Sequence, residues 1–150
     1  MSLKQQIDAD IKQAMLARET DRLRALRAIK SMILIDETKE GAGPDGLKPE
    51  EELKLLTKAV KQRKDSAEIF RQQNRADLLA TEEAEIAVIE KYLPKQLTED
   101  EIKAKLQEII ARVGAKAPSD MGKVMGVATK ELAGLAEGKV VSALVKTLLQ

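Results

Sequence analysis

The sequence predicts an all-α protein built as two helical subdomains, four longer helices followed by a compact three-helix tail. Apolar residues recur at spacings of three and four along most of the 150 residues, and no segment shows the sustained alternation of a strand. Hydrophobic residues make up 43% of the chain and aromatic residues only 1%. The core is therefore expected to be aliphatic. No segment repeats at a fixed period, which argues against a solenoid.

The first two helices have clear start signals. Ser2 and Gln5 have the spacing of a capping box, so a helix should begin just after Ser2. Thr20 can cap a second helix. The apolar face of the first helix is Leu3, Ile7 and Ile11, and that of the second is Leu23, Leu26, Ile29 and Ile33.

The next two helices follow a break in the pattern. Residues 41–49, GAGPDGLKP, hold three glycines and two prolines and predict an exposed, mobile loop. Pro49 suits the first position of a third helix, and the glutamates at 50–52 favour its positive end. A fourth helix is expected from about Ala76 to Tyr92, with Leu79, Ile86 and Ile89 pointing inward.

The last three helices are shorter. Thr98 and Glu101 form a second capping box, and Ser119 can cap the helix that follows the next turn. The three helices are expected over residues 99–112, 120–134 and 138–149.

A domain boundary is expected where Pro94 interrupts the helical pattern. Residues 1–92 would form the first domain and residues 93–150 the second. Nine basic and seven acidic residues give the second domain a net charge of +2, which leaves −1 for the first.

Composition excludes several kinds of chemistry. With neither cysteine nor histidine, the chain cannot form disulfides, thiolate sites, histidine-dependent triads or an ordinary zinc site. Acidic groups such as Glu82, Glu85 and Glu90 are most simply interpreted as a solvated helix face, and no phosphate-binding loop motif is present. No catalytic residue, metal site or cofactor is therefore expected.

The chain also lacks signals for membranes or export. No apolar run is long enough to span a bilayer, and the start MSLKQQIDAD lacks the apolar stretch of a signal peptide. The net charge of +1 gives no global attraction to a polyanion. These features predict a cytoplasmic protein without a membrane partner.

Basic residues form short rows on single helix faces. The rows are Arg24, Arg27 and Lys30 on the second helix, Lys54, Lys58 and Lys61 on the third, and the pairs Lys123 with Lys130 and Lys139 with Lys146 in the tail. Such rows can follow a phosphate backbone, or they can serve solubility alone. No aromatic residue follows Tyr92, so the tail favours contact with the backbone of folded RNA over base stacking.

Two glycines lie four residues apart inside the expected sixth helix, at Gly122 and Gly126. A glycine inside a helix costs about 1 kcal/mol relative to alanine. One explanation is that the missing side chains allow another helix to pack closely. A second is that phosphate reaches main-chain N–H groups near the helix start. The two explanations are compatible if Gly126 packs against another helix while Gly122 and Lys123 face outward.

Three segments together resemble the GatB/YqeY family: YLPKQL at 92–97, DMGKVMG at 120–126 and GLAEGKVVSALVKTLL at 134–149. The whole chain is similar to a stand-alone YqeY-like protein. Residues 93–150 resemble the C-terminal tail domain of the B subunit of the glutamine-dependent tRNA amidotransferase.

The resemblance implies an all-helical fold and a tail that contacts tRNA, while catalysis belongs to domains that have no match here. The matching positions are Gly122, Lys123, Gly126, Gly134, Gly138, Lys139 and Lys146. Gly126, Gly134 and Gly138 are expected to be structural, and Gly122 and the lysines, with Lys130, to contact RNA. Leu135 stands where the family often has a basic residue, and Glu137 where aspartate is usual.

The leading hypothesis is thus a non-catalytic module that associates with tRNA or another RNA through its tail. A second hypothesis is an adaptor whose residues 1–92 dock a protein of tRNA metabolism. A third is an accessory role in carbon–nitrogen ligation with glutamine as the amide donor, which rests on the family association alone.

Overall fold

The computed structural model describes residues 2–150 except 40, 42 and 44–45, so part of the loop expected at 41–49 lies outside the described residues. The described chain is helical, with seven α-helices and no strand, which confirms the all-α class. It forms two compact units: unit 1 is Met1–Leu93 and unit 2 is Pro94–Gln150.

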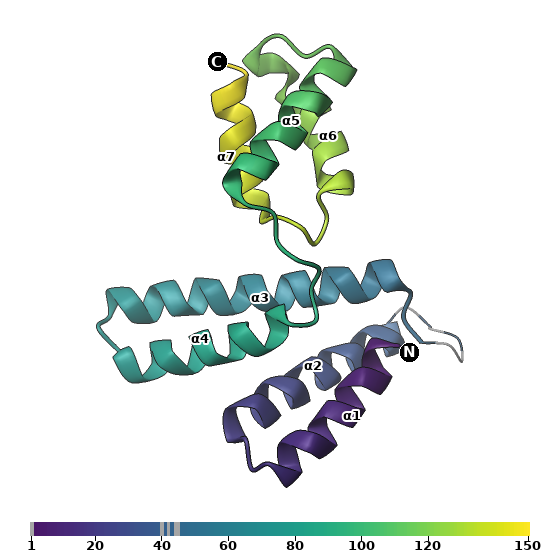
Figure 1. Cartoon of the computed structure of the whole chain (residues 1–150), viewed down its shortest axis with the longest axis vertical. Helices are drawn as coiled ribbons and strands as arrows, with labels where there is room; N and C mark the ends of the chain where they lie inside the picture. Colours follow the sequence, from purple (N-terminus) through teal and green to yellow (C-terminus); the bar gives the residue numbers. More distant parts are fainter. Residues whose placement is uncertain (1, 40, 42, 44–45) are drawn as a thin grey trace. The chain divides into compact units, whose positions relative to one another are not determined.

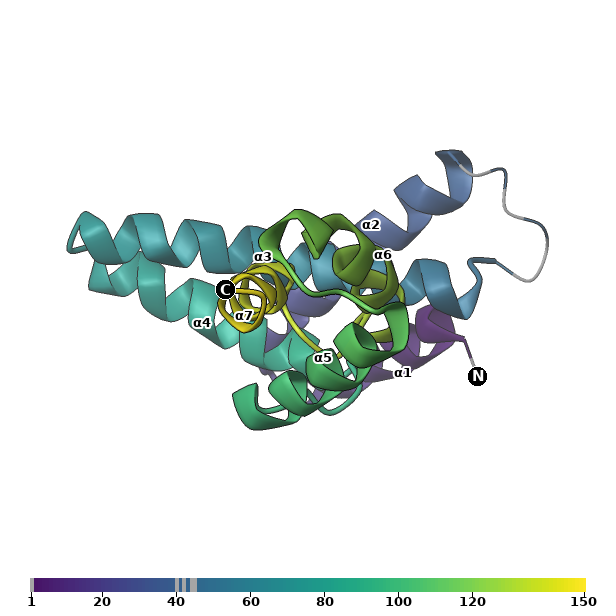
Figure 2. The ribbon, with the colours of Figure 1, turned by 90° about the horizontal axis from the view of Figure 1, so that it is seen from above.

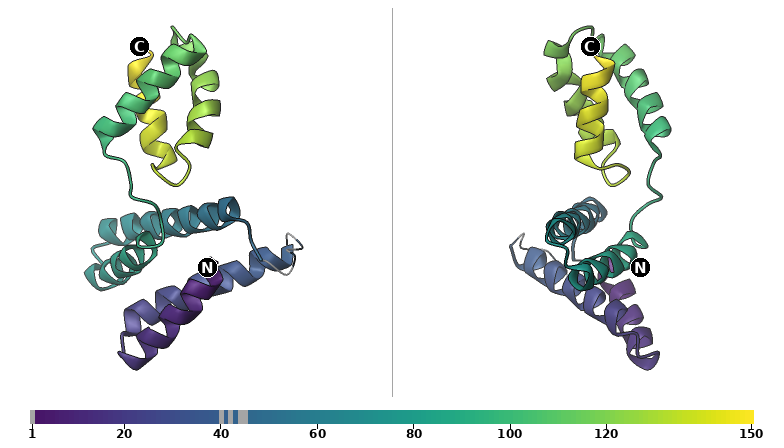
Figure 3. Two further views of the ribbon diagram at one scale, coloured as in Figure 1. Left: turned by 45° about the vertical axis from the view of Figure 1, so that its right-hand side comes forward. Right: turned by 90° about the vertical axis from the view of Figure 1, so that its left-hand side faces the viewer.

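Unit 1 contains four helices in two antiparallel pairs (Figure 1). The pairs are α1 (Leu3–Leu16) with α2 (Thr20–Lys39), and α3 (Pro49–Gln72) with α4 (Ala76–Glu90). The two pairs are joined mainly through α2, which contacts both α4 and α3. Figure 3 shows α3 and α4 side by side from two further directions.

Local signals explain where the helices of unit 1 begin and end. The Ser2 hydroxyl accepts the Gln5 N–H at 3.2 Å, and the Gln5 side chain accepts the Ser2 N–H at 3.0 Å, so the predicted capping box is confirmed. Pro49 begins α3 as expected. Left-handed residues, Arg18 with φ 56° and Asn74 with φ 57°, reverse the chain between the helices of each pair.

The core of unit 1 is aliphatic, as composition predicts. Its largest fully buried side chains are Ile7, Leu26, Ile29, Ile33 and Ile89. One charged residue of the described chain is buried, Glu85 on α4. Its carboxylate lies 3.0 Å from Arg63 Nε on α3 and 3.9 Å from Arg24 Nε on α2. This ionic cluster links three of the four helices.

Unit 2 contains α5 (Glu99–Val113), α6 (Met121–Glu131) and α7 (Gly138–Leu148), which contact one another pairwise. Figure 2 looks along α7, with α5 and α6 beside it. The Thr98 hydroxyl accepts the Glu101 N–H at 3.2 Å, which confirms the second capping box. The fully buried side chains at the centre of unit 2 are Leu106, Val124 and Val145.

The start of α6 differs from the prediction. Ser119 does not cap it but lies in a 3-10 turn, Pro118–Asp120. The carboxylate of Asp120 accepts the N–H groups of Lys116 at 3.0 Å and Ala117 at 3.3 Å, which closes this turn before the α-helix begins. The helix ends at Glu131, short of Gly134.

The segment that leads into unit 2 is fixed to the loop between α6 and α7. The Gln96 side chain donates to the Gly134 carbonyl at 2.7 Å, and the Leu97 N–H donates to the Leu135 carbonyl at 2.9 Å. Gly134 is buried with φ 74°, a conformation that other residues rarely adopt.

Candidate nucleic-acid interface

The outward face of α6 places Gly126 between two lysines. Val124 and Ala128 are buried and orient the helix, since each residue turns it by about 100°. Gly126 then points directly away from the core, with Lys123 about one turn before it and Lys130 about one turn after it. All three are exposed.

Neither glycine of α6 is explained by the fold. Apart from the backbone of its own helix turns and its two chain neighbours, a Cβ atom built at Gly122 or Gly126 would meet no heavy atom of the described chain within 4 Å. Neither has the positive φ that favours glycine, unlike Gly114 and Gly134. The close helix contact expected at Gly126 is therefore not seen. Gly126 lies inside α6, where glycine costs about 1 kcal/mol relative to alanine, and no helix packing offsets that cost.

Gly138 also differs from the expectation of a structural glycine. It is the first residue of α7, it is exposed, and a Cβ atom there would meet nothing within 4 Å. Of the three glycines expected to be structural, only Gly134 is both buried and left-handed.

The lysines of α7 form a second, similar row. Val141 and Val145 are buried, which turns Lys139 and Lys146 outward with the exposed Ala143 between them. On each of α6 and α7, the side opposite the lysines is buried in the shared core of unit 2. The two lysine-bearing sides therefore point away from that core in different directions. The structure thus brings the four lysines together as two pairs, each on its own helix, and not as one flat surface.

One anion lies near the lysines of α6, because the charge of Lys123 interacts with the Asp120 carboxylate. Hydrogen bonds from the backbone of Lys116 and Ala117 hold the pKa of the Asp120 carboxyl below its usual range, so this group stays anionic at the start of α6. Arg112 on α5 pairs with Glu108 and Glu131. No ion pair to Lys123 or Lys130 occurs among the described residues.

Sequence reasoning missed that Gly126 faces outward, although the signal was present. The apolar residues Val124 and Ala128 are four apart and set the helix phase, which leaves Gly126 on the opposite side. The hypothesis that Gly126 packs against another helix did not take into account on which side of the helix Gly126 lies relative to Val124 and Ala128.

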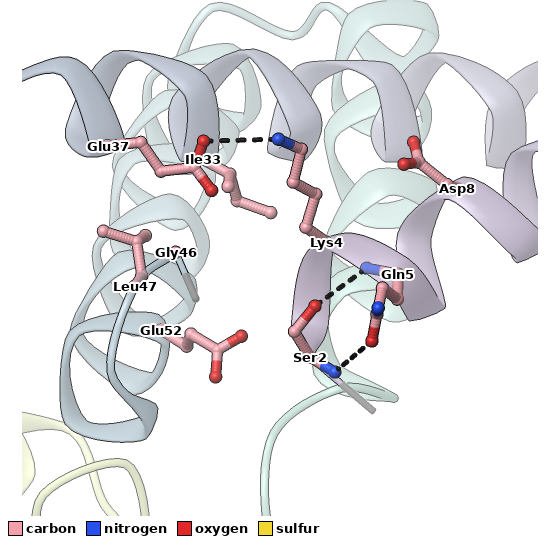
Figure 4. Close-up of a pocket in the computed structure, with 9 residues that line it drawn as sticks. All are labelled: Ser2, Lys4, Gln5, Asp8, Ile33, Glu37, Gly46, Leu47 and Glu52. Carbon is pink, nitrogen blue, oxygen red and sulfur yellow. Dashed lines mark hydrogen bonds and ion pairs between the residues drawn. The ribbon is translucent and has the colours of Figure 1, made fainter. Parts of the chain in front are cut away.

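A hollow of about 460 Å³ in unit 1 offers no comparable site (Figure 4). Polar groups around it already bind one another: Lys4 pairs with Glu37 at 3.3 Å, and Glu52 accepts the Leu3 N–H at 2.6 Å. The described residues contain no group of acidic side chains placed to hold a metal ion. Nor does any described helix combine the length and apolarity needed to cross a membrane.

The fold defines an all-helical protein of two units, the second with lysine rows on its outer faces. A family model described as "Yqey-like protein" matches residues 4–149. The chain therefore belongs to the YqeY-like family, and this part of the resemblance is confirmed.

Two curated relatives carry the name "Altered inheritance of mitochondria protein 41, mitochondrial". The one from Clavispora lusitaniae is 35% identical over 131 residues, 85% of this chain and 74% of the relative. The one from Lachancea thermotolerans is 36% identical over 113 residues, 73% of this chain and 59% of the relative. Because both are named as mitochondrial, the expectation of a cytoplasmic protein is wrong. Neither name refers to tRNA or to an amidotransferase.

Proposed function

We propose that this protein is a non-catalytic module that associates with folded RNA, such as tRNA, through the phosphate backbone. The observation that supports this function most directly is the outward face of α6. There, Gly122 and Gly126 expose the main chain beside Lys123 and Lys130. No packing contact in the described chain requires glycine at either position.

The physical basis is charge together with close approach. Lys123 and Lys130 are seven residues apart, about 10 Å along the helix axis. Neutralising phosphates releases their condensed counterions, which favours binding at low salt. At Gly126 no side chain holds the polyanion away from the helix. Unit 2 has no aromatic residue for base stacking, so the contact is with the backbone of a folded strand.

Removing both α6 lysines is expected to weaken RNA binding. For Lys123→Gln/Lys130→Gln, the slope of log K against log salt should fall in magnitude by about 2, because each phosphate contact contributes about 0.9. The measurement is the fluorescence anisotropy of labelled tRNA over a range of salt concentrations. Lys103→Gln/Lys105→Gln on α5 is the control, because it removes the same charge from another helix of unit 2.

Wild-type protein that fails to bind tRNA at low ionic strength would rule out the proposed function. Equal losses in the α6 variant and in the α5 control would instead show that net charge, and not the α6 face, governs binding. Circular dichroism checks that both variants keep their helices.

A side chain at Gly126 should separate stability from binding. Gly126→Gln is expected to raise the free energy of unfolding by about 0.5–1 kcal/mol, because glutamine is a better helix former and meets no neighbour. The same change should lower tRNA affinity, because the side chain holds the phosphates away from the helix. Gly126→Ala serves as the graded control, with a similar gain in stability and a smaller loss of affinity. If Gly126→Gln binds tRNA with unchanged affinity, close approach of phosphates to the helix at Gly126 is no longer part of the proposal.

An adaptor function of unit 1 is the second candidate. Leu34 and Ile35, adjacent on the outward side of α2, are 43% and 55% exposed, which is high for large aliphatic side chains. A partner of tRNA metabolism would cover them. The test is a pull-down with the full chain. The adaptor function is favoured over RNA association if Leu34→Glu/Ile35→Glu loses the captured protein and Lys123→Gln/Lys130→Gln retains it.

A further inference from the structure

We propose that unit 1 supplies a second phosphate-binding row, Lys54, Lys58 and Lys61 on α3, which binds an RNA backbone as unit 2 does. This inference rests on the proposed function, which it extends from unit 2 to unit 1.

The three lysines share the outward face of α3. Leu55, Leu56, Ala59 and Val60 are buried on the opposite side of the same turns. Spacings of four and three residues keep Lys54, Lys58 and Lys61 in one row, about 10 Å from end to end. All three are exposed. The row is therefore fixed by the same contacts that hold α3 in the core.

The row is distinguished by its lack of partners. Within the described part of the chain, none of the three lysines makes an ion pair or a side-chain hydrogen bond. The later basic residues of α3 differ: Arg63 pairs with Glu85 at 3.0 Å, Lys64 with Glu90 at 3.7 Å, and Arg71 with Glu68 at 2.6 Å. The three lysines thus have no acidic partner in the described chain, although Glu50 and Asp65 share their face one turn before and one turn after the row.

The basic row on α2 shows the contrast within the same unit. Arg24 pairs with Asp21 and Glu85, and Lys30 lies 2.6 Å from Asp8. From the sequence, the α2 and α3 rows were equivalent. In the folded protein, two of the three cations on α2 are held by acidic groups, whereas those on α3 are open to a ligand.

One feature favours a nucleic-acid backbone over an acidic protein segment. The first and last lysines of the α3 row are seven residues apart, the same span as Lys123 to Lys130 on α6. One ligand with repeating charge would suit both.

The test uses the full chain, labelled tRNA and the triple variant Lys54→Gln/Lys58→Gln/Lys61→Gln. The expected result is a salt slope smaller in magnitude by about 2–3 and an affinity lower by roughly 100-fold near 0.1 M salt. The matched control is Lys12→Gln/Lys39→Gln/Lys91→Gln, which removes three positive charges from other parts of unit 1. If the triple variant loses helicity, the single reversal Lys58→Glu replaces it, compared with Lys12→Glu.

The outcomes separate the two proposals. If the triple variant binds tRNA as tightly as the control does, the proposal for the α3 row is overturned. If Lys123→Gln/Lys130→Gln then still lowers tRNA affinity, the function proposed for unit 2 stands. If the triple variant keeps tRNA affinity but loses binding to polyglutamate, the row belongs to an acidic protein partner and the inference is also overturned. If variants of both units bind like wild type, both proposals fail.

Discussion

Replacing Glu85 with alanine is expected to lower the free energy of unfolding of unit 1 by about 3 kcal/mol. The side chains of Arg63 and Glu85 are only 14% and 11% exposed, and their charged atoms are 3.0 Å apart. Without the carboxylate, the guanidinium of Arg63 stays largely removed from water and loses its ion pair, and the carboxylate of Glu82 is the remaining anion that its charge meets. This unpaired buried charge accounts for most of the loss.

Urea denaturation followed by circular dichroism measures the effect. Glu83→Ala is the matched control, because Glu83 is an exposed glutamate on the same helix and pairs only at the surface. The double variant Arg63→Met/Glu85→Leu should recover much of the stability, since apolar side chains of similar size replace a buried ion pair well. A loss in Glu85→Ala no larger than in Glu83→Ala would mean that water already solvates the cluster.

The sequence did not predict this cluster. Glu82, Glu85 and Glu90 were interpreted as a solvated acidic face, yet Glu85 is buried and Glu82 is half-buried. Burial raises the pKa of Glu82, and the charge of Glu85 adds to the shift. The partner of Glu85 is 22 positions away on another helix. Spacing within α4 cannot reveal it.

Features set by a few neighbouring residues were predicted well. The capping boxes at Ser2 and Thr98 are confirmed, because each needs only residues three positions apart. The start of α6 was predicted wrongly because Asp120 binds backward to Lys116 and Ala117. A side chain that can cap forward or close the preceding turn leaves the helix boundary ambiguous.

The lysine rows illustrate the same limit at the candidate site. Helical spacing places Lys54, Lys58 and Lys61 on one face, and the structure agrees. Whether a cation is held by an acid depends on the neighbouring helix: Lys30 of α2 meets Asp8 of α1 only because those helices pack together. Sequence spacing identifies candidate rows, and tertiary packing decides which of them remain open to a ligand.

Replacing Leu106 with alanine is expected to destabilise unit 2 by about 3 kcal/mol, from lost apolar burial and the cavity left behind. The Leu106 side chain is 0% exposed at the centre of the α5, α6 and α7 core. A unit as small as Pro94–Gln150 has little stability to spare, so the variant should unfold unit 2 under conditions in which unit 1 stays folded.

Tyr92 makes this outcome measurable. It is the one tyrosine of the chain, which has no tryptophan, and its hydroxyl donates to Asp10 within unit 1. Tyrosine fluorescence therefore follows unit 1, whereas circular dichroism follows the helices of both units. In Leu106→Ala, part of the dichroism should be lost at lower urea while the fluorescence transition stays in place. The matched variant Leu26→Ala, also at 0% exposure but in the core of unit 1, should shift the fluorescence transition. If Leu106→Ala shifts the fluorescence as much as Leu26→Ala does, the two units unfold as one, because a cavity in one core would then destabilise the other.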